Sequence, residues 1–284
     1  MASGSMPVML AMSRFAELVR AGLPEDLAER WIHLAEPDGY RLFAAGAGDE
    51  TVGALGGEPL LPGSVEWPHW EGHGPLSFVA SLDCAGLPGV GLPKDGKLLF
   101  FYFDPQAHNF SSYVNTDDPE TCAGARVLYV PDGTEGEPRR TPEPLSPYRH
   151  VPLRQVTGMD PVRLMDSEVW KPLGLTPDDL DGVKHFEYVL FDEDQGEAGH
   201  QVGGRPQHIQ HPVALEIAGS VVGNLDDDER LWDEARRWML LAQIAGDEGA
   251  GMEWGDGGRL YWMIMCEDLE ARRFDRVRLV WQSH

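Results

Sequence analysis

The feature that most constrains the fold is an internal repeat of apolar segments. Two pairs of segments match: SFVASLD at 77–83 with MLLAQIA at 239–245, and GKLLFF at 96–101 with GRLYWM at 258–263. The separation along the chain is the same for both pairs. A short apolar run beside a glycine turn is typical of a buried strand. Each half is therefore predicted to contain the same pair of neighbouring strands.

Two further matches flank these strands in the same order. They are Gly56-Gly57-x-Pro59 with Gly203-Gly204-x-Pro206 upstream, and ARVLYV at 125–130 with DRVRLV at 275–280 downstream. Four matches in one order predict a duplicated unit, with pseudo-repeats at 51–130 and 200–284. Two units cannot form a solenoid, so we expect them to pair around a pseudo-twofold axis. A groove between them is then the natural place for a ligand.

The predicted fold class is α+β, rich in short antiparallel strands. The 33 glycines and 22 prolines favour turns and short strands over a helical bundle. Near the N-terminus, apolar residues at helical spacing and a Pro24-Glu25-Asp26 start predict two short helices between about 11 and 36. We expect residues 1–50 to form a helical cover over one face of the sheet, and residues 51–284 to form the main domain.

The two pseudo-repeats are predicted to be joined by a connector and a helix. Residues 131–149 are rich in proline and poor in apolar side chains, which indicates an exposed connector. Thr176 followed by Pro177 and acidic residues is typical of a helix start, and this helix is expected to reach about residue 191. Another helix is expected at about 226–237, before the strand MLLAQIA.

The charge balance excludes some classes of partner. The chain has 47 acidic and 23 basic residues and a formal net charge of −24, so it repels nucleic acids and anionic membrane surfaces. No apolar stretch has the length of a membrane helix, and the start of the sequence lacks the pattern of a signal peptide. The three cysteines have no C-x-x-C spacing, so they predict neither a disulfide framework nor a thiolate zinc site. We expect a cytoplasmic protein without a cofactor.

Several stretches resemble the YwqG-like family, a bacterial domain family of unknown function. The resemblance covers roughly residues 50–284 and rests on Leu55-Gly56-Gly57-x-Pro59 with Trp67-Pro68, Gly96-Lys97-Leu98, Gly203-Gly204 with Ile209-Gln210, Leu240 to Ile244, and Trp254-Gly255-Asp256-x-Gly258-Arg259. The sequence departs from a symmetric pattern at Ser81, where an equivalent of Gln243 is expected. The resemblance implies a fold more firmly than a function, and some family members are thought to be immunity proteins that neutralise bacterial toxins.

The candidate metal ligands are three histidines, His200, His208 and His211, in the sequence GHQVGGRPQHIQHP. Zinc sites usually add a cysteine or a carboxylate in register, which this stretch lacks. An exposed polar loop is therefore the favoured interpretation, and no metal is predicted.

No catalytic residue is predicted, but Asp256 is a candidate with two open interpretations. Next to Trp254, its carboxyl group could act as a general base, because an aromatic wall raises the pKa of a carboxyl group. Asp-Gly before an apolar run is also typical of a tight hairpin turn, which is the favoured interpretation. No nucleophile motif and no phosphate-binding glycine loop is present in the sequence.

The leading hypothesis is a non-enzymatic binding protein, of the immunity type, that covers a basic protein. The acidic clusters at 178–181, 192–194 and 226–229 would then form a docking face, although helix starts also account for two of them. The alternative is a small-molecule binder or enzyme with a cleft between the two halves. The side chains expected to line that cleft are Trp67, Gln210, Gln243, Trp254 and Asp256.

Overall fold

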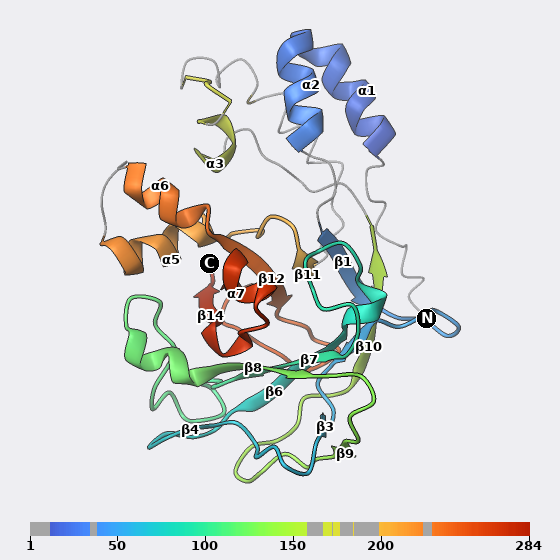
Figure 1. The fold of residues 1–284 in the computed structure, drawn as a ribbon, viewed down its shortest axis with the longest axis vertical. Coiled ribbons are helices and arrows are strands. Elements are labelled where there is room, and N and C mark those ends of the chain that lie inside the picture. The colour runs from blue at the N-terminus through green and yellow to red at the C-terminus, as the bar shows by residue number, and fades with distance from the viewer. Residues whose placement is uncertain are drawn as a thin grey trace.

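The computed structural model describes residues 12–34, 39–157, 167–171, 173–176, 184, 199–223 and 229–284. These residues form a mixed structure of helices and antiparallel strands (Figure 1). The described α-helices are α1 (Met12–Gly22), α2 (Glu25–Leu34), α3 (Ser167–Trp170), α5 (Val213–Val222), α6 (Glu229–Ala235) and α7 (Cys266–Glu270). The described strands are β1 (Gly39–Ala44), β2 (Gly53–Leu55), β3 (Leu60–Leu61), β4 (His69–Trp70), β5 (Gly74–Pro75), β6 (Ser77–Asp83), β7 (Lys97–Tyr102), β8 (Ala125–Val130), β9 (Glu137–Pro138), β10 (Val151–Val156), β11 (His200–Gly203), β12 (Trp238–Ala245), β13 (Arg259–Met265) and β14 (Arg278–Gln282).

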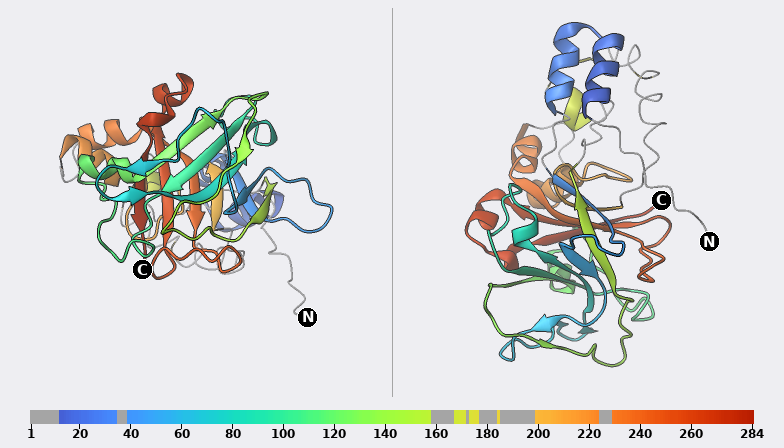
Figure 2. Two further views of the ribbon diagram at one scale, coloured as in Figure 1. Left: turned by 90° about the horizontal axis from the view of Figure 1, so that it is seen from below. Right: turned by 90° about the vertical axis from the view of Figure 1, so that its right-hand side faces the viewer.

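Ten strands form one sheet in the order β14-β13-β12-β11-β1-β10-β2-β6-β7-β8, and every pair in it is antiparallel. The order is symmetric about its centre, because each end carries three strands that follow one another in sequence. The sheet curls so strongly that it nearly closes into a barrel (Figures 1 and 2). The antiparallel, strand-rich prediction is confirmed.

The inner face of the curled sheet carries the main hydrophobic core, to which both ends contribute. Phe100 on β7 and Trp262 on β13 meet there edge to face, with ring centroids 5.2 Å apart. The predicted neighbouring strands are present as the antiparallel pairs β6–β7 and β12–β13. These strands are mainly apolar and mostly buried, because both of their faces are covered.

Different elements cover the outer face at the two ends of the sheet. At the β6–β8 end, the segment that carries β3, β4 and β5 packs apolar side chains, including Leu61 and Trp70, in one cluster with Phe101 and Phe103. At the β12–β14 end, helix α5 packs Val213 and Ile217 against the sheet. The two ends therefore share a strand pattern but bury their outer faces differently.

The N-terminal helices do not form the expected cover over the sheet. Helices α1 and α2 pack on each other and on residues around α3, in a cluster that contains Phe15, Trp31 and Val169 and no residue of the sheet. Both lie beyond the rim of the sheet in Figure 1. Strand β1, within residues 1–50, instead pairs with β10 and β11 at the centre of the sheet.

The last strand of each half aligns differently from the sequence match. Arg126 lies opposite Phe101, and Arg278 lies opposite Met263, so Arg126 corresponds to Arg278 and not to Arg276. The register of these two strands therefore differs by two residues from the sequence match. A shift by two leaves each side chain on the same face of a strand, so the apolar pattern did not reveal it.

The linking segments are less simple than predicted. The connector at 131–149 is largely exposed but contains β9, which pairs with β3, and a buried Leu145. Helix α6 begins at Glu229, immediately after residues that are not described. The helix predicted from Thr176 to about residue 191 lies largely outside the described residues.

Candidate functional site

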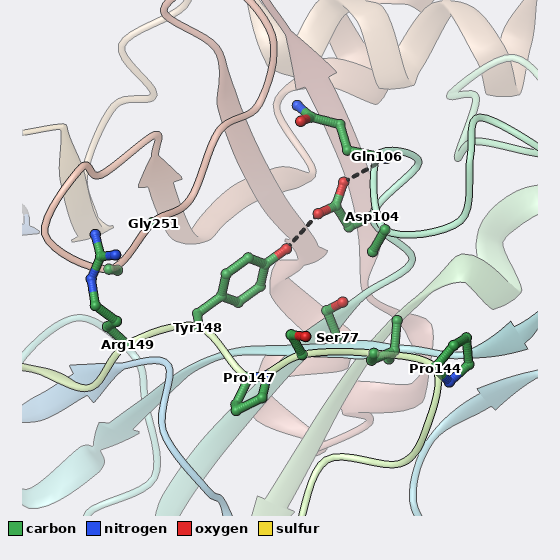
Figure 3. A pocket seen from close by; sticks show the side chains of 12 residues that line it. Ser77, Asp104, Gln106, Pro144, Pro147, Tyr148, Arg149 and Gly251 are labelled. Carbon is green, nitrogen blue, oxygen red and sulfur yellow. Dashed lines mark hydrogen bonds between the residues drawn. The ribbon is translucent and has the colours of Figure 1, made fainter.

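A cleft of about 480 Å³ lies between the two ends of the sheet (Figure 3). Segments far apart in the sequence form its wall. They are Ser77 at the start of β6, the residues Asp104, Gln106 and Ala107 after β7, Pro144 to Arg149 from the connector, and Ala250 with Gly251 from the loop between β12 and β13. The cleft therefore combines both predicted halves and the connector between them.

Of the described residues, Asp104 is the one acidic residue that lines the cleft, and it is only 7% exposed. Its Oδ1 accepts a hydrogen bond from the backbone N–H of Gln106 at 2.9 Å, which fixes the turn that follows β7. Its Oδ2 accepts a hydrogen bond from the hydroxyl of Tyr148 at 2.6 Å (Figure 3). A carboxylate offers about four lone-pair directions, so two donors leave capacity for a cationic or neutral donor from a ligand.

Tyr148 lies in the middle of the cleft wall, between Arg149 and Asp104 (Figure 3). Burial, followed by the negative charge of Asp104, raises the pKa of Tyr148 far above its ordinary value. The nearby Ser77 hydroxyl has a smaller, opposite effect on that pKa. Tyr148 is therefore a stable hydrogen-bond donor at neutral pH and is not suited to act as a base.

The glycine pair Gly56-Gly57 supports the cleft wall from behind. A Cβ atom on Gly56 would lie 2.5 Å from the carbonyl oxygen of Arg149 and 2.7 Å from that of Tyr148. Gly57 donates its backbone N–H to the carbonyl oxygen of Tyr148 at 2.9 Å. The Gly-Gly motif thus allows the connector to approach β2 closely, which holds Tyr148 in place.

Arg149 attaches the connector to the loop between β12 and β13. Its Nε donates to the carbonyl oxygen of Gly249 at 2.6 Å, and its Nη2 donates to that of Glu248. The backbone N–H of Arg149 donates to the carbonyl oxygen of Ala250 at 2.8 Å. These bonds define the end of the cleft opposite Asp104.

A buried histidine orders the same loop. The backbone N–H of Ala245 donates to His200 Nδ1 at 3.2 Å, so His200 donates from Nε2 to Asp247 Oδ2 at 3.3 Å. This hydrogen bond lowers the pKa of Asp247. Asp247 Oδ1 in turn accepts the backbone N–H of Ala250 at 2.6 Å, so His200 has a structural role beneath the cleft.

The structure separates Trp254 from Asp256. Trp254 is 2% exposed and lies behind the cleft, with its ring edge to face against both Tyr102 and Tyr148 at 5.7 Å. Asp256 is exposed in the turn before β13, and its carbonyl oxygen accepts the backbone N–H of His284. Neither side chain lines the cleft, although Trp254 supports it through Tyr148.

The two candidate glutamines contribute to loop structure. Gln243 is fully buried on β12, where its Oε1 accepts the backbone N–H of Gln207 and its Nε2 donates to the carbonyl oxygen of Gly199. Gln210 is exposed and donates its side-chain Nε2 to the carbonyl oxygen of Ser283. These three bonds fasten the segments on either side of β11 to β12 and to the residues after β14, and none of the groups lines the cleft.

The remaining sequence candidates also lie outside the cleft. Trp67 donates its Nε1 to the carbonyl oxygen of Leu76 at 2.8 Å and packs edge to face on Phe101. His208 and His211 lie in the loop after β11. Within the described residues, no three His, Cys, Asp or Glu side chains come together as a metal site.

A second hollow of about 320 Å³ lies at the turn between β6 and β7 and beside the residues after β8. Its polar side chains include Asp83, Asp95, Asp132 and Lys97. Asp83 accepts the backbone N–H of Ala85, and Asp95 accepts the hydroxyl of Tyr129. Asp83 thus caps a local turn and Asp95 is bonded to β8, which leaves the first cleft as the better candidate site.

Sequence reasoning did not identify the groups that line the cleft. Asp104 follows the predicted strand KLLFFYF directly, and a carboxylate at a strand end was an available signal. Tyr148 and Arg149 lie at the end of a connector that was expected to be exposed. Nothing local in the sequence indicates that these residues meet, since the curling of the sheet brings them together.

A comparison with family models covers most of the sheet but not β1. A model described as Domain of unknown function (DUF1963) matches residues 54–283. This range includes every residue that lines the cleft, and it begins within β2. The comparison with curated proteins gives no match. In the described part of the chain, every helix is too short or too polar to cross a membrane.

Proposed function

The chain belongs to the DUF1963 family of domains of unknown function, so we propose its function from the cleft. It is a non-enzymatic binding protein whose cleft receives a cationic side chain of a basic protein partner. Asp104 is the group that pairs with the cation. The surrounding chain carries a formal net charge of −24, which attracts basic partners over long range and speeds their association.

The observation that carries this proposal is the buried Asp104 carboxylate within an open cleft. Two hydrogen-bond donors orient the Asp104 carboxylate. Among the ion pairs of the described residues, none involves Asp104. A lysine or arginine group entering the cleft would form a charge-assisted hydrogen bond in a setting poorer in water than the surface. Such bonds are roughly twice as strong as those between neutral groups.

The second candidate function is binding of a small molecule in the same cleft, with or without catalysis. It is favoured by the cleft volume of about 480 Å³, which lies within the range of about 300–1,000 Å³ for small-molecule sites. The carboxylate of Asp104 again favours a cation, such as a small amine. The two candidates therefore differ in the size of the ligand and share its charge.

The experiment compares two variants that remove one negative charge each. Asp104→Asn removes the charge inside the cleft, and Asp256→Asn removes one from an exposed turn outside it. The probe is a labelled synthetic peptide of lysines separated by serines, and its binding is measured by fluorescence anisotropy at low salt. We expect Asp104→Asn to weaken binding about tenfold or more, because a cation loses its partner. Asp256→Asn should change it less than twofold.

Equal effects of the two substitutions would contradict the proposal, and so would a wild-type protein that does not bind the peptide. Thermal unfolding of both variants checks that each is folded. Free spermidine, added as a competitor, distinguishes the two candidates. If spermidine displaces the peptide at spermidine concentrations near the dissociation constant of the peptide, a small amine is favoured as the ligand.

We also propose a narrower kinship with the YwqG-like family, and with it a bacterial, cytoplasmic, immunity-type role. Its support is that the stretches quoted for the resemblance, from Leu55 to Arg259, fall within the range matched by the family model. An immunity protein must cover its target, and an acidic protein with a cation-accepting cleft suits a basic target.

We infer that the two ends of the sheet derive from an internal duplication. Three observations support this: the symmetric strand order, a register shift at the same place in β6 and β12, and the contact between Phe100 and Trp262. The two aromatic residues occupy matching positions in the repeat, so their contact is expected on a pseudo-twofold axis. The cleft would then lie at one of the two junctions between the duplicated units.

A further inference from the structure

The loop after β7, whose first residues line part of the cleft, presents two large apolar side chains to solvent. Phe110 is 74% exposed and Tyr113 is 54% exposed. Exposed aromatic side chains are uncommon in proteins and are enriched at the anchor positions of protein interfaces. These two belong to the same loop that supplies Asp104, Gln106 and Ala107 to the cleft wall.

The backbone of this loop is held in a conformation that disfavours Phe110. Asn109 and Phe110 have φ angles of 53° and 55°, in the left-handed region that a bulky residue rarely adopts. The N–H of Phe110 donates to the carbonyl oxygen of Pro105 at 2.7 Å, and the N–H of Ser111 donates to that of His108 at 3.1 Å. Backbone strain of this kind persists only where the surroundings enforce it, and it is concentrated at functional sites.

The surroundings enforce it through His108. Its ring stacks on Phe103 with centroids 3.9 Å apart and an interplanar angle of 10°, and its Nε2 lies 3.0 Å from the carbonyl oxygen of Pro75. Gln106 fixes the start of the loop by donating its side-chain Nε2 to the carbonyl oxygen of Glu253, across the cleft. The loop is thus held at Gln106 and at His108, so little further conformational entropy is lost when a partner covers Phe110.

We propose that Phe110 is the apolar anchor of the interface, with Tyr113 beside it, and that the partner presents an apolar side chain next to the basic side chain that enters the cleft. This inference rests on the proposed function and adds the second half of the recognition pattern. The partner is a basic polypeptide because the chain has a net charge of −24 and the cleft offers the Asp104 carboxylate, whereas the other charged group of its lining, Arg149, is bonded to the carbonyl oxygens of Gly249 and Glu248. The carboxylate selects charge, and the aromatic side chain selects an adjoining apolar group.

The test uses the full chain and two labelled peptides of equal length and equal lysine content. One peptide has serines between the lysines, and in the other some serines are replaced by leucines. We expect the wild-type protein to bind the leucine peptide roughly tenfold more tightly, as is usual for an anchor residue. Phe110→Ala should remove that preference and leave the affinity for the serine peptide unchanged. The matched control is Val221→Ala, at an exposed apolar residue of α5, which should keep the preference.

The outcomes separate this inference from the proposed function. Loss of binding of both peptides in Asp104→Asn, together with an unchanged preference in Phe110→Ala, would refute the anchor and leave the proposed function intact. A wild-type protein that binds neither peptide would overturn both. A dimer seen by light scattering that Phe110→Ala dissociates would identify a second copy of the chain as the occupant and overturn the basic partner. Phe110→Gly, which relieves the left-handed backbone, should unfold no earlier than the wild type on heating and should also lose the preference.

Discussion

Replacement of Tyr148 by phenylalanine should destabilise the protein at neutral pH and lose this effect at alkaline pH. The substitution removes the hydroxyl that donates to Asp104 at 2.6 Å and changes little else in the shape of the cleft wall. A hydrogen bond to a charged group contributes about 1.5–3 kcal/mol. Water in the open cleft can replace the lost donor, so we expect the free energy of unfolding to fall by about 1.5 kcal/mol at pH 7.

The loss of this stabilisation at alkaline pH follows from the raised pKa of Tyr148. Above pH about 10 the tyrosine ionises in the unfolded chain, whereas it keeps its proton in the folded protein. The unfolded state then binds fewer protons than the native state, so the free energy of unfolding falls as the pH rises. One such group contributes about 1.4 kcal/mol per pH unit. The stabilisation by Tyr148 is therefore fully present below pH about 10 and should nearly vanish by pH about 11.

The assay is urea unfolding followed by tryptophan fluorescence, at intervals from pH 7 to pH 11, for the wild type and Tyr148→Phe. Tyr113→Phe is the matched control, since it removes a hydroxyl from an exposed ring and should leave the free energy of unfolding at pH 7 unchanged. A difference between wild type and Tyr148→Phe that stays constant over the whole pH range would refute the reasoning. It would mean that Tyr148 ionises at the same pH in both states.

Two further predictions concern the supports of the fold and the cleft. Gly56→Ala should lower the free energy of unfolding by about 1–3 kcal/mol, because Gly56 has a φ of +55° and the new Cβ would lie 2.5 Å from the carbonyl oxygen of Arg149. Chemical denaturation measures this loss, and an unchanged unfolding midpoint would contradict the close approach. Gln243→Leu should lower the free energy of unfolding by about 2–4 kcal/mol, because the backbone N–H of Gln207 and the carbonyl oxygen of Gly199 lose their partner, the Gln243 amide. Hydrogen exchange of the Gln207 amide should become faster. A loss below about 1 kcal/mol would contradict a structural role for Gln243.

The sequence predicted secondary structure better than it predicted the site. The helices expected between about 11 and 36 and the strands expected around Leu98 and Ala242 are present, because their apolar spacing reflects burial of a helix stripe or of a strand. The expected helical cover was wrong in its placement, since an amphipathic helix indicates that one face is buried but not against what. Here that face is buried against α1, α2 and α3 themselves.

The candidate site residues were chosen for residue type and local pattern, and these signals have other causes. Trp254 and Gln243 are buried because they fill the core or fasten a loop, and Asp256 is in the turn that was its favoured interpretation. The groups that do face the cleft, such as Asp104 and Tyr148, have no distinctive sequence context. A local sequence pattern reflects how one segment is buried or turned, whereas a site depends on which segments come together in the fold.

The sequence by itself determined the strands, their glycine turns and the acidic character of the chain, because these depend on neighbouring residues and on composition. Only the tertiary structure decided that β1 and β10 join two similar strand sets, and that the resulting sheet curls until its ends approach each other. That curl brings Asp104, Tyr148 and Gly251 around one cleft. The physical reason is that burial of the inner apolar face by both ends is a property of the whole sheet, and no single segment encodes it.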